Sequence, residues 1–133
     1  MKKLLLVCLI LFPVGCKQEA RFQGFPTSYW IKELKNPSYV ARMRAANALS
    51  NLGPEAKQAI PDLIELLGDS EPLVRWAAAD TLGHFGSDAR DALPTLKKLA
   101  AEDKDPRARA SAEWAVKAIS TPANPQKTEG AGQ

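Results

Sequence analysis

Chemically reactive side chains are scarce in this sequence of 133 residues. It contains 2 cysteines and 1 histidine, and both cysteines, Cys8 and Cys16, lie near the N-terminus. The rest of the chain can therefore form neither an intramolecular disulfide nor a cysteine-ligated metal site. No HExxH, GxSxG or glycine-rich phosphate motif occurs, and no general acid or base stands out among the 15 acidic residues. We predict no catalytic residue, no cofactor and no metal.

An excess of one charge is also missing. The formal net charge of +3 includes Lys2 and Lys3, which belong to an N-terminal segment that we expect to be removed. Without these two lysines, 16 basic residues face 15 acidic residues, and they form no basic block. This balance disfavours a nucleic-acid partner or a polybasic membrane surface.

The first residues, MKKLLLVCLILFPVGC, read as a targeting segment. The two lysines precede an apolar run that is shorter than the roughly 20 residues of a membrane-spanning helix. The segment resembles a bacterial lipoprotein signal, in which the cysteine is acylated and becomes the mature N-terminus. Val14, Gly15 and Cys16 fit that pattern, whereas Pro13 stands where leucine is usual. An ordinary secretory signal cut nearby, or a short uncleaved anchor, is the alternative.

The resemblance implies a signal peptide at 1–15 and lipid attachment at Cys16. It also implies export to the cell membrane or outer membrane of a bacterium, held there through the N-terminal lipid only. Lys17 replaces the aspartate associated with inner-membrane retention, which favours the outer membrane in a double-membraned host. Residues 16–27 lack periodicity and are expected to form a linker, and residues 121–133 are expected to form a disordered tail. A folded domain is expected at 28–120.

The folded part repeats. The stretch NLGPEAKQAIPDL, residues 51–63, recurs 33 residues later as HFGSDARDALPTL. A third copy of the segment between these stretches follows at an offset of 34. The recurring positions are Arg42, Ala45, Ala46, Leu49, Gly53, Ala56, Ala59 and Pro61, which match Arg75, Ala78, Ala79, Leu82, Gly86, Ala89, Ala92 and Pro94. Periods of this size indicate a solenoid of stacked units.

Each unit carries two helical patterns. In the central unit, Val74, Ala78, Leu82 and Phe85 fall on one side of a helix, and Gly86 is expected to cap its C-terminal end. The partner helix has an apolar stripe at Leu93, Leu96, Leu99 and Ala100. Asn36-Pro37 and Asp105-Pro106 each place a capping residue before a proline, which predicts helix starts at the prolines.

The pattern of LG or FG, two alanines, an aliphatic residue, proline and leucine, together with VRxxAAxxL at Val74, resembles HEAT repeats. The resemblance is particularly to the short bacterial type related to phycobilisome lyase repeats. It implies an all-α fold, a short right-handed α-solenoid of about three pairs of outer and inner helices. The outer helices are expected at 28–35, at 55–67 with a break near Pro61, and at 89–101 with a break near Pro94; the inner helices at 38–52, 72–85 and 106–119. The residue before each break, Ile60 or Leu93, is expected to avoid helical geometry.

A ladder of polar residues follows the same register. Asn36, Asp69 and Asp103 each lie six residues before Arg42, Arg75 and Arg109. In HEAT families, an acceptor in the turn and an arginine early in the next helix tie adjacent units together. A charge-assisted hydrogen bond suits that purpose. Because the pattern recurs in every unit, we interpret it as structural rather than enzymatic.

The side of the inner helices that faces away from the core is the candidate binding surface. We define this inner face by Met43, Asn47 and Asn51, then Trp76, Asp80 and His84, then Ala110, Trp114 and Ala118. Tryptophans are enriched at binding hot spots, so Trp76 and Trp114, with Asp80 and His84 beside them, could receive a protein or peptide. The alternative is that both indoles pack into helix interfaces.

The predicted function is therefore a non-catalytic protein-interaction module, a scaffold or adaptor tethered at the cell envelope. Two alternatives stay open. One is a lyase-like chaperone or accessory subunit of an enzyme complex, and the other is a purely structural spacer. The expected partner is a protein or peptide, with no nucleic acid.

Overall fold

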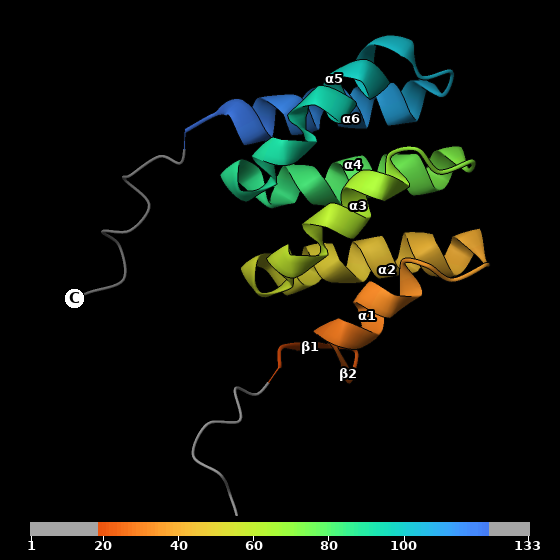
Figure 1. Ribbon diagram of the computed structural model, residues 1–133, viewed down its shortest axis with the longest axis vertical. Helices are drawn as coiled ribbons and strands as arrows, with labels where there is room; N and C mark the ends of the chain where they lie inside the picture. Colours follow the sequence, from red (N-terminus) through yellow and green to blue (C-terminus); the bar gives the residue numbers. More distant parts are fainter. Residues whose placement is uncertain (1–18, 123–133) are drawn as a thin grey trace, which may run out of the picture.

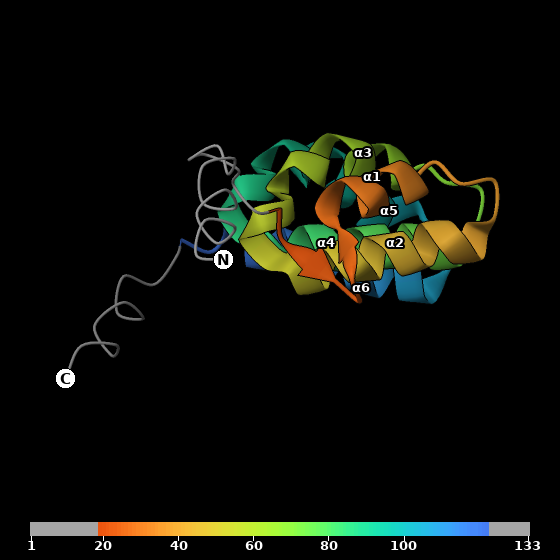
Figure 2. The same ribbon diagram turned by 90° about the horizontal axis from the view of Figure 1, so that it is seen from below.

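The computed structural model describes residues 19–122, and its helices form three pairs stacked along one axis (Figure 1). The inner helices are α2 (Tyr39–Leu52), α4 (Pro72–His84) and α6 (Pro106–Ser120). The outer helices are α1 (Thr27–Glu33), α3 (Ile60–Leu66) and α5 (Leu93–Glu102). Seen along the stack, they make two layers (Figure 2). The prediction of a short all-α solenoid with three helix pairs is confirmed.

A 3-10 helix connects each of the first two inner helices to the next outer helix. These are η1 (Gly53–Ala59), between α2 and α3, and η2 (Gly86–Ala92), between α4 and α5. Each begins at a glycine with a positive φ angle, 62° at Gly53 and 55° at Gly86. This left-handed geometry ends the preceding helix, as expected, because glycine adopts it without steric cost. The outer segments are broken near Pro61 and Pro94, as the sequence predicts.

The geometry before each proline differs from the expectation. Ile60 has φ −52° and ψ −46°, and Leu93 has φ −54° and ψ −45°, so both are helical. The prediction that they avoid helical geometry was wrong. Ala59 and Ala92, one residue earlier, are also in the right-handed helical region, and within η2 the kink lies at Ala89, with φ −94° and ψ 21°. In both outer segments proline occupies the first turn of the new helix. Proline loses no hydrogen bond there, because the first four amides of an α-helix have no intrahelical acceptor.

The predicted start is correct for the inner helix α6 but not for α2. At α6, Asp105 accepts hydrogen bonds from the backbone amides of Arg107 (2.9 Å) and Ala108 (3.2 Å), and the helix begins at Pro106 as predicted. At α2, the predicted start at Pro37 was wrong. There the Asn36 side chain accepts instead from the amide of Ser38 at 2.9 Å, and the helix begins one residue after Ser38. The side chain of Asn36 thus stabilises the turn rather than the helix end.

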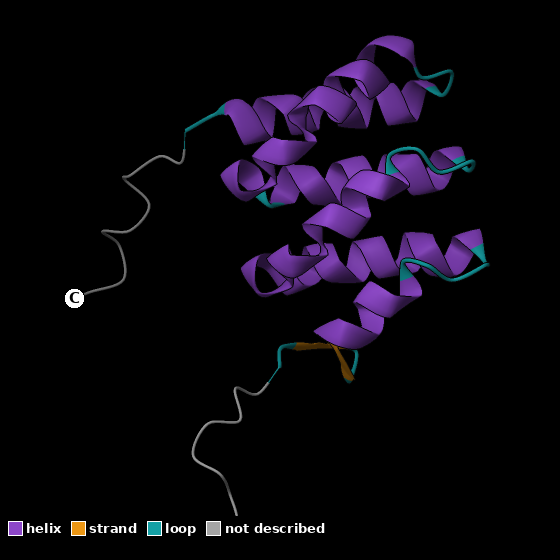
Figure 3. Ribbon diagram, in the orientation of Figure 1, coloured by secondary structure: helices purple, strands orange, loops and turns teal. Residues whose placement is uncertain are grey.

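A β-hairpin precedes the first helix, where the sequence predicts an unstructured linker over 16–27. Strands β1 (Arg21–Phe22) and β2 (Phe25–Pro26) pair in antiparallel fashion, and they are the only strands in the described residues (Figure 3). Gln23 and Gly24 join them with φ angles of 51° and 83°. Two successive positive φ angles define the tight turn whose twist suits a hairpin. The linker prediction therefore fails for residues 19–27.

The hairpin closes the N-terminal end of the stack with aromatic rings. Trp30 of α1 is only 4% exposed, and its indole N–H donates to the carbonyl of Phe22 at 3.3 Å. The Phe25 ring stacks on Tyr29 with centroids 4.4 Å apart and meets Trp30 edge-on at 5.7 Å. Such pairs add to the free energy of simple burial. The apolar cover of the first unit thus consists of Tyr29 and Trp30 of α1 together with the two phenylalanines of the hairpin.

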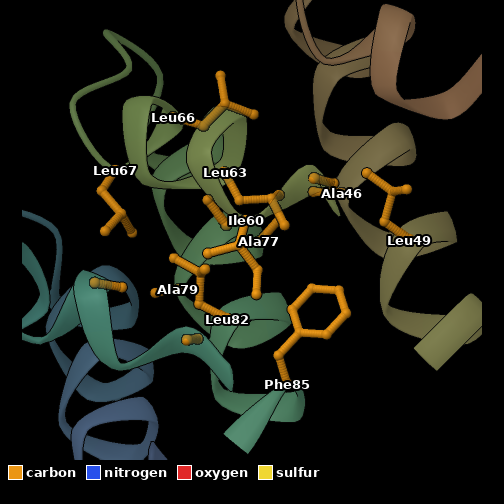
Figure 4. Packing of buried hydrophobic residues seen from close by; sticks show 14 of the residues in the cluster. Ala46, Leu49, Ile60, Leu63, Leu66, Leu67, Ala77, Ala79, Leu82 and Phe85 are labelled. Atoms are coloured by element: carbon orange, nitrogen blue, oxygen red, sulfur yellow. The ribbon is translucent and has the colours of Figure 1, made fainter. Parts of the chain in front are cut away.

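The core runs through the stack between the two layers. Figure 4 shows Ile60 and Leu63 of α3 directed toward Leu82 of α4, with Leu49 of α2 nearby. Alanines fill the closest contacts between inner helices and are completely buried: Ala45, Ala46, Ala77, Ala78, Ala79, Ala112 and Ala115. Their small side chains let neighbouring helices approach closely. The predicted core stripe at Val74, Ala78, Leu82 and Phe85 is buried.

One buried hydroxyl also joins two units. The Oγ1 atom of Thr81 in α4 lies 3.0 Å from the carbonyl of Ala46 in α2 and 2.7 Å from that of Ala77 in its own helix. Thr81 is fully buried, and a buried hydroxyl without an acceptor would destabilise the fold. Ser111 of α6 makes a similar bond to the preceding unit from a different register position, since its hydroxyl donates to the carbonyl of Trp76 at 3.2 Å.

Candidate functional site

The arginine ladder lies along the edge of the stack where the outer helices turn into the inner helices (Figure 3). The Nε and Nη2 atoms of Arg42 donate to both carboxylate oxygens of Asp69 in the next unit, at 2.8 and 2.9 Å. Its Nη1 atom donates to the backbone carbonyl of Asn36 in its own unit, at 2.9 Å. One guanidinium therefore joins two turns of neighbouring units.

We call each pair of an arginine and a carboxylate in the ladder a rung. The second rung, Arg75 with Asp103, repeats the first, Arg42 with Asp69. Arg75 donates to both oxygens of Asp103 at 2.7 and 3.0 Å and to the backbone carbonyl of Asp69 at 2.8 Å. Only 16% of the Arg75 side chain and 5% of the Asp103 side chain are exposed. Paired, planar contacts of this kind are among the stronger charge-assisted hydrogen bonds.

The ladder carboxylates are held in their charged form. Hydrogen bonds from Arg75 lower the pKa of Asp103 against the opposing effect of burial. At Asp69, burial is the largest influence and opposes ionisation, but hydrogen bonds from Arg42 and from the amide of Glu71 outweigh it and lower the pKa. Each carboxylate also accepts from the amide two residues later, so it fixes its own turn as well as its partner arginine.

The ladder is incomplete at both ends. Within residues 19–122, no arginine donates to the side chain of Asn36, and its side-chain amide donates to Glu33 at 3.0 Å. Arg109 donates through Nη1 to the backbone carbonyl of Asp103 at 2.7 Å, in the same way as the other two arginines. No carboxylate of the described chain lies within ion-pair distance of its other nitrogens. The six predicted ladder residues thus supply two complete rungs and two open ends.

On the inner face, Trp114 does not approach Trp76. Its six-membered ring lies against Gly83 of α4, so closely that an added Cβ on Gly83 would overlap the ring. The indole also meets the imidazole of His84, with ring centroids 5.0 Å apart. Trp114 nevertheless remains 43% exposed, because only one side of the indole is covered. The sequence marks Trp114 but not Gly83, whose missing side chain makes room for the indole.

Trp76 and its neighbours have a different character. Trp76 is partly buried and packs against the core, while its carbonyl accepts from Ser111. The Nδ1 atom of His84 lies 2.8 Å from the carbonyl of Asp80 and 3.6 Å from its carboxylate. Asp80 and His84 therefore contact each other and His84 contacts Trp114, whereas Trp76 is partly buried against the core.

Grooves interrupt the surface of the described residues. One of about 520 Å³ lies at the N-terminal end between the hairpin and α2. A groove of about 410 Å³ lies at the C-terminal end between α5 and α6, and one of about 310 Å³ lies beside Leu99 and Asp103. Within residues 19–122, no group of three or more metal-binding side chains is found. In the same range, no helix has the length and apolar character needed to cross a membrane.

A family model for HEAT repeats matches residues 27–117, the region that forms the three stacked helix pairs. The chain belongs to the HEAT-repeat family. No curated protein is similar enough to count as a match. HEAT repeats are generally protein-interaction scaffolds and are typically non-catalytic.

Both ends of this HEAT stack carry a charged residue that sequence reasoning overlooked. Arg44 takes the register position of Ala77 and Ser111, which face the preceding unit. Glu113 takes the position of Ala46 and Ala79, which face the following unit. The signal was available in the repeat, because the small residue changes to a charged one only in the end units. The predicted lipid site at Cys16 lies outside the described residues.

Proposed function

We propose that this HEAT-repeat chain is a non-catalytic protein-interaction module that captures a protein or peptide on its inner face. Trp114 carries the proposal. Its indole is held on Gly83 and against His84 while much of its surface stays exposed. A rigid, half-exposed indole offers apolar area without a further loss of side-chain entropy on binding, which is typical of a hot-spot residue.

We further propose that the module is a scaffold or adaptor at a bacterial cell envelope, anchored through acylated Cys16 and of the phycobilisome-lyase-like HEAT type. The N-terminal sequence motivates the anchor, and the repeat pattern around Val74 motivates the HEAT subtype. The HEAT-repeat match supports the protein partner.

Site-specific photo-crosslinking in cells tests the binding face. A photo-reactive residue at Ala110 or Ala118, on either side of Trp114, samples the inner face, and one at Lys98 on the outer helix α5 is the matched control. We expect a defined adduct from the inner positions only. The adduct should disappear when Trp114→Ala is added, while circular dichroism shows an unchanged fold. Equal capture from Lys98, or an adduct that survives Trp114→Ala, would contradict the assignment.

Fatty-acid labelling tests the anchor separately. Cells that express the wild type or Cys16→Ser are grown with a clickable fatty acid, and the two proteins are compared on a gel after detergent extraction. We expect label on the wild type alone. Label that persists on Cys16→Ser would rule out acylation at this residue without affecting the binding proposal.

A further inference from the structure

The groove at the N-terminal end lies between the hairpin, which precedes the matched HEAT region, and the inner helix α2. One wall is the hairpin, with Phe22 and Gln23, and the other is α2, with Val40, Met43 and Arg44. Figure 2 shows the hairpin lying across α2 at this end. The groove of about 520 Å³ falls in the size range of small-ligand and peptide sites.

A packed helix does not suit this groove. Elsewhere in the stack, an inner helix fills the equivalent space, and its neighbour presents Ala77 or Ser111 at the closest contact. Arg44 stands at that position in α2, and its long, exposed side chain prevents a helix from approaching at the same spacing. The hairpin also occupies part of this space. The hairpin and Arg44 together therefore disfavour the packing of a further HEAT unit at this end.

The polar groups of the groove suit an extended chain instead. Gln23, Asn47 and Asn51 bring three carboxamides to the lining, and a carboxamide can both donate to and accept from a peptide backbone. The Asn51 amide donates to the carbonyl of Asn47 at 2.8 Å. Among the described residues, the side chains of Gln23 and Asn47 have no hydrogen-bond partner within the chain. Val40, 41% exposed, adds apolar surface beside them.

The positive charge of Arg44 favours a negatively charged partner in the groove. Arg44 makes no ion pair within the described chain, no carboxylate lines the groove, and α2 contains no acidic residue. The two acidic residues that precede α2 in the described chain are already engaged, because Glu19 accepts from Ser28 and Glu33 accepts from Asn36. A free guanidinium beside apolar surface favours a carboxylate, which it can bind through two hydrogen bonds.

Gln23 supplies a further, independent observation. It is the one non-glycine residue with positive φ in the described chain. Glycine or asparagine adopts this geometry more readily, so glutamine here carries a local conformational cost. Strained residues cluster at functional sites, and this one lines the groove.

From these observations we infer that the groove is a second docking site, which binds an extended acidic peptide segment of another protein. Arg44 binds an aspartate or glutamate side chain of that segment, the carboxamides of Gln23 and Asn47 bind its backbone, and Val40 and Phe22 contact an adjacent apolar side chain. The groove shares Met43, Asn47 and Asn51 with the inner face, but it lies at the opposite end of the stack from Trp114, so this proposal does not depend on the proposed role of Trp114.

Selection from a phage library of random dodecapeptides against the full chain tests this inference. We expect the enriched peptides to carry an acidic residue next to an apolar one. Arg44→Glu should shift the enrichment to lysine or arginine. It should also weaken the peptides selected on the wild type by at least about tenfold, as expected from losing a charge-assisted hydrogen bond. Arg90→Glu, the same charge change on exposed η2, is the matched control and should leave both results unchanged.

Gln23→Gly separates binding from folding. Glycine accepts the left-handed turn but removes the carboxamide, so peptide affinity should fall while the thermal unfolding midpoint stays the same or rises. Trp114→Ala should not alter the selected peptides. An enrichment without acidic residues, or one that is identical on wild type and Arg44→Glu, would overturn the inference while leaving the inner-face proposal untouched.

Discussion

The first and the last unit of the stack differ in how their outward-facing apolar surface is covered. At the N-terminal end, an additional hairpin covers α1, with Trp30 buried beneath two phenylalanines. At the C-terminal end, no extra element covers α5 and α6 in the described chain. There Lys97, Glu113 and Lys117 border the surface around Ala100 and Val116. One end buries apolar surface with added chain, and the other exposes charge on the repeat itself.

The difference shows where stability is concentrated. In a solenoid each unit contacts only its neighbours, so an end unit lacks one of its two interfaces. The hairpin replaces the missing interface of the first unit with aromatic contacts. The third unit instead relies on the interface between α4 and α6, which includes Trp114 on Gly83 and the Arg75 rung. Substitutions at the N-terminal cover should therefore cost more free energy than those at the C-terminal surface.

The largest effect is expected from Trp30→Ala. Removing a buried tryptophan should lower the free energy of unfolding by about 3–5 kcal/mol. Val116→Ala, at the partly buried C-terminal surface, should cost about 1 kcal/mol or less. Urea unfolding followed by circular dichroism measures both. Equal losses would show that the aromatic cover does not support the first unit.

The next effect compares an inner rung with the open end of the ladder. Arg75→Ala leaves the largely buried carboxylate of Asp103 without its partner. The loss should be about 2–3 kcal/mol, below the range for fully buried pairs because part of Arg75 is exposed. Arg109→Ala removes no ion pair of the described chain and should cost about 1 kcal/mol or less. The comparison fails if the two variants unfold at the same urea concentration.

Acid sensitivity tests the same rungs without removing side-chain volume. The pKa values of Asp69 and Asp103 are lowered in the folded state, so their contribution is complete above the unfolded value of about 4 and is lost as pH falls through the folded values. Asp105, whose pKa is lowered to about 2 chiefly by its hydrogen bond with Arg107, follows the same sign.

Wild type should therefore lose stability on acidification from about pH 4 toward pH 2. The double variant Asp69→Asn, Asp103→Asn should be less stable at pH 7 and should change less over the acidic interval. Thermal unfolding at several pH values provides the measurement. Parallel pH profiles for the two proteins would mean that the rungs do not set the acid sensitivity.

The smallest effect is expected at Gly83. A methyl group there must displace the indole of Trp114, but that side chain is already half exposed and can move outward. We expect Gly83→Ala to shift tryptophan emission to longer wavelength while changing the free energy of unfolding by about 1 kcal/mol or less. Ser50→Ala, at the same register position of α2, is the control and should leave the emission unchanged. An unshifted spectrum for Gly83→Ala would contradict the contact.

The repeat explains how much of the fold was predictable. The matches at offsets of 33 and 34 residues locate all three helix pairs, the glycine-capped ends and the breaks near Pro61 and Pro94. The hairpin was not predictable in this way, because strands of two residues are too short for any periodicity. Ile60 is helical because its core position and the freedom of the first helical turn outweigh the local preference before proline.

The candidate sites also differ in how far the repeat predicts them. Repetition identifies Asp69, Arg75 and Asp103, because a contact made between units leaves a periodic trace. The inner face is predicted only as a set of positions. Trp114 packs against Gly83 rather than Trp76 because of the direction of its side chain, and the periodicity of the sequence does not predict that direction. The groove beside Arg44 requires the hairpin, so it could not be found before the hairpin was seen.

The ladder also bears on how such a chain can change its length over evolution. Each unit carries both halves of a joint, an acceptor in its turn and an arginine six residues later, and the joint closes only across a unit boundary. A duplicated unit inserted between two others would arrive with its own acceptor and its own donor. Both new boundaries would close without any compensating mutation. Arg109 shows where growth by duplication would find a donor already in place.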